Sequence, residues 1–208
     1  FLEIWYELSG SGITRATLEA ARVDGATGVV LDPAGLVVDA HVRAYGGTSA
    51  VPSDGGAYLI AIQDGFSSVV DVADPKNPKL LATIGMPSGT HSHKARVGNG
   101  IMLTNHEVLG VKAARGEVAP GDFRGGLGVY DIENPAKPKL ITNWEVSGAA
   151  LPGTGVHRFD FDGRYAYISP TCDGYIGNIV MILDFKNPAK PEEVGRWWMP
   201  GQWQAGGE

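Results

Sequence analysis

Three of the five histidines of this 208-residue sequence lie in one stretch, GTHSHKARVGNGIMLTNHE, at residues 89–107. The Asn-Gly pair at its centre is the preferred sequence of a two-residue β-hairpin turn. Because side chains alternate across a strand, a two-residue turn here puts His91, His93 and His106 on one face, and only a three-residue turn would move His106 away. Opposed Cβ atoms are about 4.5–5.5 Å apart in such a hairpin. Imidazoles at that spacing can share one metal ion.

A fourth histidine occupies an equivalent position further along the chain. The segment HKARVGNGIMLTNH (93–106) aligns without a gap with HRFDFDGRYAYISP (157–170), so that His157 matches His93. An all-imidazole set suits Cu, Fe or Zn better than Ca or Mg, which prefer oxygen ligands. We therefore predict a transition-metal site formed by all or some of four residues: His91, His93, His106 and His157. The alternative is that each histidine only hydrogen-bonds backbone carbonyls at a strand end.

Glu107 and three recurring aspartates are expected to have roles other than metal binding. Glu107 follows His106 directly, so that regular alternation points its side chain to the opposite face. Asp71, Asp131 and Asp184 recur at matching positions of three similar segments. Aspartates at such positions are expected to cap turns.

The similar segments are VVDVADPKNPKL, GVYDIENPAKPKL and MILDFKNPAKPEEV. Each has an apolar run ending in Asp, then a turn with two prolines, then a second run. Proline lacks an N–H group and is expected in the turn rather than in the sheet. Together with the preceding hairpin, each unit supplies four antiparallel strands, which is the blade of a β-propeller.

We therefore predict an all-β chain that supplies about three blades, roughly half of a propeller ring. The blades are expected near residues 56–86, 93–146 and 157–200, within a partial propeller at 51–208. Residues 1–50 form a segment of uncertain structure that is a candidate for closing the ring. Within it, residues 13–23 are compatible with a short helix and residues 35–45 with a strand.

The three Asp-x-x-Asn-Pro-type segments resemble those of the LVIVD-repeat β-propellers, over roughly residues 56–200. The segment GTHSHKARVGNGIMLTNH is also similar to the histidine-rich segment of the selenium-binding proteins, or methanethiol oxidases. That second resemblance implies a propeller with a copper site built from histidines and redox chemistry. Lys94 stands where those proteins have a cysteine, so the detailed chemistry is expected to differ.

Propellers close with about 4–8 blades, and three blades leave apolar sheet faces exposed. We expect the rest of the ring to come from a second chain, a partner copy or a missing C-terminal half. The sequence begins at Phe1, as expected of a processed form, a cleavage product or a trimmed chain. An insertion at 111–126 is a candidate wall for a substrate pocket.

Composition excludes several functional classes. Hydrophobic residues make up 43% of the chain and charged residues 19%, which is typical of a folded globular protein. The formal net charge of −6 and the lack of a basic cluster argue against nucleic acid as a partner. No apolar run is long enough to span a membrane. A single cysteine excludes an internal disulfide. The composition is compatible with a soluble periplasmic or secreted protein but does not decide the compartment.

Two functions follow from these features. The first is a transition-metal-dependent enzyme that acts on a small organic substrate at a histidine-lined channel mouth. Redox chemistry is slightly favoured, with a metal-dependent hydrolase or lyase as the alternative. The second is a binding or scaffold propeller without chemistry, because fold alone does not determine function.

Overall fold

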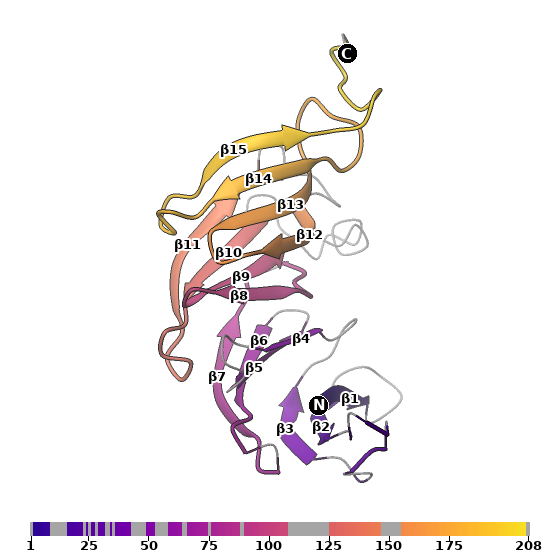
Figure 1. The fold of residues 1–208 in the computed structure, drawn as a ribbon, viewed down its shortest axis with the longest axis vertical. Coiled ribbons are helices and arrows are strands. Elements are labelled where there is room, and N and C mark those ends of the chain that lie inside the picture. The colour runs from indigo at the N-terminus through magenta and orange to yellow at the C-terminus, as the bar shows by residue number, and fades with distance from the viewer. Residues whose placement is uncertain are drawn as a thin grey trace.

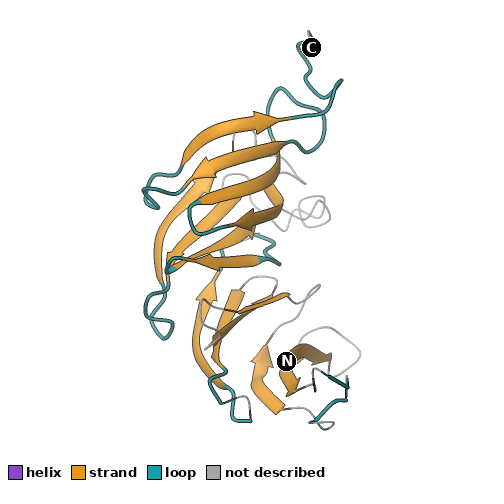
Figure 2. Cartoon of the chain, in the orientation of Figure 1, coloured by secondary structure: helices purple, strands orange, loops and turns teal. Residues whose placement is uncertain are grey.

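The computed structural model describes most of the chain, and the account below is confined to this part. The described residues are 2–8, 16–22, 24, 26–27, 29–31, 34, 36–42, 49–52, 58–63, 66–74, 76–87, 90–107, 125–146 and 155–206. They contain strands, turns and loops but no helix (Figure 2). The predicted all-β class is confirmed.

The strands among the described residues form four antiparallel sheets. The first sheet consists of β1 (Leu2–Leu8), β2 (Ala16–Arg22) and β3 (Leu36–Val42). Blade 1 consists of β4 (Ser49–Pro52), β5 (Tyr58–Gln63), β6 (Phe66–Asp71) and β7 (Lys79–Gly85). Blade 2 consists of β8 (Ala95–Gly98), β9 (Ile101–His106), β10 (Gly126–Asp131) and β11 (Lys139–Glu145). Blade 3 consists of β12 (Gly155–Phe161), β13 (Tyr165–Thr171), β14 (Val180–Asp184) and β15 (Glu192–Trp197).

The sheets follow one another along an open arc, from β1–β3 at one end to β15 at the other (Figure 1). Within each blade the strands pair in chain order, each antiparallel to the next. The first strands of consecutive blades, β4, β8 and β12, contact one another. Contact between first strands is expected where blades converge on a propeller axis. The predicted four-stranded propeller blades are therefore confirmed.

The N-terminal region contributes a sheet of its own. The strand expected at 35–45 is present as β3. The helix considered at 13–23 is wrong, because residues 16–22 form β2, which pairs with strands on both sides. Local helix propensity is overridden here by the backbone hydrogen bonds of the sheet. The role of this sheet in closing the ring stays a prediction.

The recurring aspartates cap the turns, as predicted. Asp71, Asp131 and Asp184 each accept a hydrogen bond at Oδ1 from the backbone N–H two residues further on, at 2.9, 3.0 and 2.7 Å. The strand pair around each turn also has a register shift just before the aspartate. The repeated sequence thus specifies the same bulged strand and the same turn three times.

The structure does not test the role of the insertion at 111–126 or the expected location of the protein. The insertion at 111–126 lies outside the described residues except for its last two positions, and its role stays a prediction. No helix among the described residues is long and apolar enough to cross a membrane. The periplasmic or secreted location also stays a prediction.

Blades 2 and 3 touch at the tips of their first hairpins. A Cβ atom on Gly98 would lie 2.7 Å from Cα of Gly163, so the two backbones approach as closely as glycine permits. Asn99 Nδ2 donates a hydrogen bond of 3.0 Å to the Gly163 carbonyl across this junction. Below the tips, an apolar core that includes Leu103, Leu127 and Phe159 fills the space between the blades.

The glycine contact can be tested by adding one methyl group. We expect Gly98→Ala to destabilise the protein by about 2 kcal/mol, because the new Cβ forces the hairpin tips apart. Gly85→Ala is the matched control, since a Cβ at that position meets nothing within 4 Å. Urea unfolding of both variants measures the difference. Equal unfolding midpoints for the two variants would contradict the proposed contact.

Candidate metal centre between two blades

The hairpin that carries the histidine-rich stretch has the predicted two-residue turn. Gly98 pairs with Ile101, which leaves Asn99 and Gly100 as the turn. Both have positive φ, 50° for Asn99 and 72° for Gly100. This is the backbone of a type I′ turn, whose twist matches that of the flanking strands.

Further from the turn, the strand pairing is not regular. Asn105 N–H still bonds to the Lys94 carbonyl in the register of the hairpin, at 3.2 Å. The next paired residues are His91 and Glu107, which exchange backbone hydrogen bonds of 2.7 and 3.1 Å. Between these pairs one strand has one residue more than the other. The stretch therefore contains a β-bulge.

The bulge changes which side chains share a face. Ser92 and His93 together oppose the single residue His106. Because of the extra residue, alternation on the two strands is shifted by one beyond this point. Glu107 consequently joins His91 on one face, whereas His106 points to the other. The expectation that Glu107 faces away from the histidines is wrong for this reason.

The same bulge occurs at the equivalent place in blade 3. Val156 pairs with Pro170 and Arg158 pairs with Ser169, so that His157 is the additional residue on β12. His93 and His157 thus match in sequence and also in backbone irregularity. A bulge re-aims a side chain out of the regular alternation, and bulges are common next to functional sites.

Asn105 holds the bulge of blade 2 in place. Its Oδ1 accepts hydrogen bonds from the backbone N–H groups of His93 and Lys94, at 2.9 and 2.8 Å. Its Nδ2 donates a hydrogen bond of 3.1 Å to the Val156 carbonyl in blade 3. The side chain is fully buried. One amide therefore fixes the irregular backbone and joins it to the neighbouring blade.

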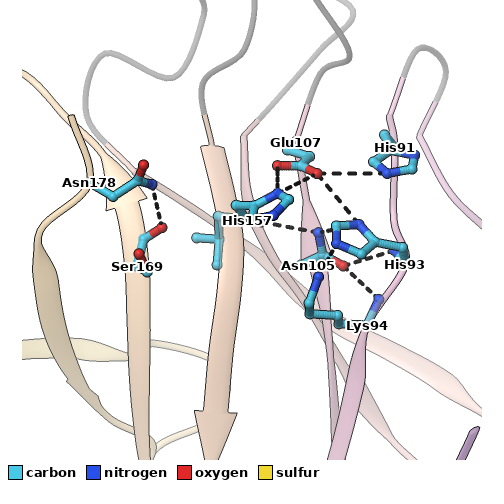
Figure 3. Close-up of polar contacts among 9 residues, drawn as sticks. His91, His93, Lys94, Asn105, Glu107, His157, Ser169 and Asn178 are labelled. Carbon is cyan, nitrogen blue, oxygen red and sulfur yellow. Dashed lines mark hydrogen bonds and ion pairs between the residues drawn. The ribbon is translucent and has the colours of Figure 1, made fainter. Parts of the chain in front are cut away.

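The carboxylate of Glu107 lies among three imidazoles (Figure 3). Its Oε1 is 3.7 Å from His91 Nε2 and 3.4 Å from His93 Nδ1. On the other side, His157 Nδ1 lies 2.8 Å from Oε2 and 3.0 Å from Oε1. His91, His93 and Glu107 are largely buried, whereas 51% of the His157 side chain is exposed. The cluster thus contains side chains from both blades and is open to solvent at His157.

The distances separate two kinds of contact. The His157 contact is a normal hydrogen bond to a carboxylate. The contacts of Glu107 with His91 and His93 are longer than usual hydrogen bonds. Two ligand atoms that bind the same tetrahedral ion, each about 2.1 Å from it, lie about 3.4 Å from one another. His91, His93 and Glu107 are the group among the described residues whose possible ligand atoms could hold an ion, all lying within 4.8 Å of one another.

The imidazole of His93 is held in its neutral form. Burial lowers the pKa of this imidazole to about 3, and the positive charges of Lys94 and Arg158 act in the same direction. The ring is therefore neutral at pH 7 and keeps a lone pair for a metal. Lys94 Nζ contacts His93 Nε2, and burial lowers the pKa of this lysine as well.

His106 lies outside the cluster. It is fully buried on the face of β9 that points toward blade 1, where its Nε2 is 3.3 Å from Thr104 Oγ1. Burial lowers the pKa of its imidazole to about 4, so that it is neutral at pH 7. The structure therefore brings together three of the four predicted histidines, adds Glu107, and places His106 elsewhere. A ligand role for His106 stays a prediction.

A close approach of the two backbones positions His157. Glu107 also forms an isolated bridge with Gly155, the first residue of β12. A Cβ atom on Gly155 would lie 2.3 Å from the His106 carbonyl oxygen, and its φ is 110°. Only glycine fits this position. Glu107 is therefore bonded to His91 on one side and to blade 3 on the other.

Comparison with protein families gives one match on the chain. The model of the LVIVD repeat matches residues 121–146, the segment that contains β10 and β11. The resemblance predicted from the Asp-x-x-Asn-Pro-type segments is thereby confirmed, whereas the similarity to selenium-binding proteins stays a prediction. No curated protein matches the sequence.

Solved structures share the fold of this chain at low sequence identity. A protein from Lactobacillus plantarum has a TM-score of 0.60 at 14% identity, covering 95% of this chain and 54% of its own. A functionally unknown protein from Desulfotomaculum acetoxidans has a TM-score of 0.53 at 11% identity, covering 93% of this chain and 56% of its own. The dihydro-heme d1 dehydrogenase NirN has a TM-score of 0.51 at 15% identity, covering 92% and 36%. The likeness supports the propeller fold, and this chain spans about half the length of the first two proteins.

Removal of the Asn105 amide tests how the site is held. We expect Asn105→Ala to cost roughly 3 kcal/mol of unfolding free energy, because two backbone N–H groups lose their acceptor in a buried position. Asn143→Ala, at an exposed position of β11, is the matched control. Chemical denaturation measures both. A loss no larger than that of the control would show that the bulge does not depend on this side chain.

Proposed function

We propose that this chain is the metal-binding part of a β-propeller enzyme that acts on a small organic substrate. His91, His93 and Glu107 would bind one transition-metal ion, and His157 of blade 3 would hold the Glu107 carboxylate in place by a hydrogen bond. The observation that supports this is the convergence of two imidazoles and one carboxylate at distances suited to one ion. His93 is neutral at pH 7, as a ligand must be.

The mixed donor set narrows the choice among Cu, Fe and Zn. Two histidines and one carboxylate with open positions are typical of non-haem iron oxygenases. The same donors hold catalytic zinc in metallohydrolases. When bound, iron would supply redox chemistry, and zinc would supply Lewis-acid chemistry. We place an iron-dependent oxidoreductase first and a zinc-dependent hydrolase or lyase second.

The protein residues have separable tasks in this proposal. His157 donates its Nδ1–H to the Glu107 carboxylate, which orients the carboxylate and fixes the tautomer of the imidazole. Its other nitrogen, Nε2, belongs to a half-exposed ring and would carry the lone pair of that tautomer. That atom can accept a proton from a substrate or from water. Asn105 and Gly155 keep the two blades at the spacing that this requires.

We also propose that further blades complete the ring. The chain spans 54% and 56% of two proteins with the same fold, and four sheets form only an arc. Further blades could come from a second chain or from a continuation of this one. They would enclose the exposed side of His157 and provide the remainder of a substrate site.

Metal content tests the proposed function. We expect natively purified protein to contain near-stoichiometric iron, zinc or copper, measured by plasma mass spectrometry. Glu107→Gln and His93→Ala should each lower metal content at least tenfold, because each removes one of only three protein ligands. Metal that is added back to metal-free protein should raise the thermal midpoint of the unsubstituted protein. The thermal midpoint of Glu107→Gln should not change.

His106→Gln is the control for this experiment. His106 lies on the other face of β9, so that this variant should keep its metal if it remains folded, as checked by circular dichroism. Loss of metal from His106→Gln with retention in Glu107→Gln would favour the all-histidine set instead. A native protein that is folded but free of metal would contradict the proposal and favour a binding or scaffold propeller.

A further inference from the structure

The outer face of blade 3 exposes a row of large apolar side chains at the end of the arc. Val194, Trp197 and Met199 are 55%, 61% and 59% exposed, and Tyr167 on the neighbouring β13 is 43% exposed. Val194 and Trp197 lie on β15, and Met199 follows that strand. Large apolar groups gathered on one face usually mark an interaction surface.

The internal repeat shows what this face is built to contact. Alignment of Asp131 with Asp184 matches the last two strands of blades 2 and 3 position by position, and the hairpin alignment that matches His93 with His157 does so for the first two strands. In blade 2 the equivalents of Val194, Trp197 and Met199 are apolar too, and they pack against blade 3. These equivalents are Ile141, Trp144 and Val146. The equivalent of Tyr167 is Leu103, which is fully buried in the same core.

The strand register makes this correspondence strict. In blade 2, Leu127 pairs with Trp144, and both belong to the core between blades 2 and 3. In blade 3, Val180 pairs with Trp197 in the equivalent register. The same pairs of positions thus present the same kind of surface. Blade 2 uses this surface to seat the next blade, and blade 3 repeats it at the end of the arc (Figure 1).

We propose that this face of blade 3 binds a second copy of the chain, so that two arcs close one ring. Two copies contribute eight sheets, within the range of closed propellers. Each chain spans about half the length of two proteins that share its fold. At the opposite end of the arc, the sheet β1–β3 has three strands among the described residues, whereas each blade has four.

Two-fold symmetry gives this assembly two identical junctions. At each junction, the face that contains Trp197 in one copy meets the β1–β3 end of the other. Both contacts form together, so that the ring closes and does not extend into a filament. This inference specifies the partner for the ring closure proposed above, and it does not depend on the metal.

Sedimentation equilibrium of the 208-residue chain tests the inference. We expect a dimer, with twice the mass of the chain, over a wide range of protein concentration. Trp197→Glu should weaken dimerisation by roughly tenfold or more, because it places a charge at the centre of the face that the dimer would bury. Met199→Glu is a second variant at the same face, for use if the first does not fold.

Leu140→Glu is the matched control, because Leu140 is 55% exposed but lies at the position that Glu193 occupies in blade 3. This variant should remain dimeric. A monomeric unsubstituted chain, an open polymer that grows with concentration, or equal weakening by Leu140→Glu would overturn the inference. Metal content measured on the same samples keeps the two proposals distinct, since a metal-loaded monomer contradicts only this one and a metal-free dimer contradicts only the proposed function.

Discussion

The backbone of Glu107 is the point on which the candidate site depends. It pairs with His91 on one side and with Gly155 on the other. The first pairing closes the bulge of blade 2, and the second draws the first strand of blade 3 toward the end of β9. Without a Cβ at Gly155, the two backbones can approach closely enough for both. The side chain of Glu107 is thereby held where three imidazoles surround it.

Burying the Glu107 carboxylate in this cluster lowers the stability of the fold unless polar groups contact it. A largely buried carboxylate needs partners, and His157 supplies one strong hydrogen bond. His93 is neutral at pH 7, so that its 3.4 Å contact with Glu107 is no ion pair at that pH. Two near neighbours of the carboxylate therefore lie at distances that suit a bound cation better than a hydrogen bond.

The blades are similar in construction but differ at the site. His93 and His157 match in sequence and in their bulges, yet one is largely buried and the other is half exposed. Glu107 is matched in blade 3 by Thr171, so that blade 3 has no equivalent carboxylate. A repeat unit thus supplies the scaffold, and single differences between units make a site at one junction. The same comparison between blades explains why Trp144 is packed and Trp197 is exposed.

The sequence by itself determined the elements of the three repeated units, but not those of the N-terminal sheet. Apolar runs, the Asn99-Gly100 turn and the recurring Asp71, Asp131 and Asp184 act over a few residues, and such local rules predict strands, hairpins and blades. The match of His157 with His93 also follows from the repeat. The tertiary structure alone decided that Glu107 joins the cluster and that His106 does not. That choice depends on one extra residue in the strand, held by Asn105 from across the sheet, and a shift of one residue reverses which face a side chain occupies.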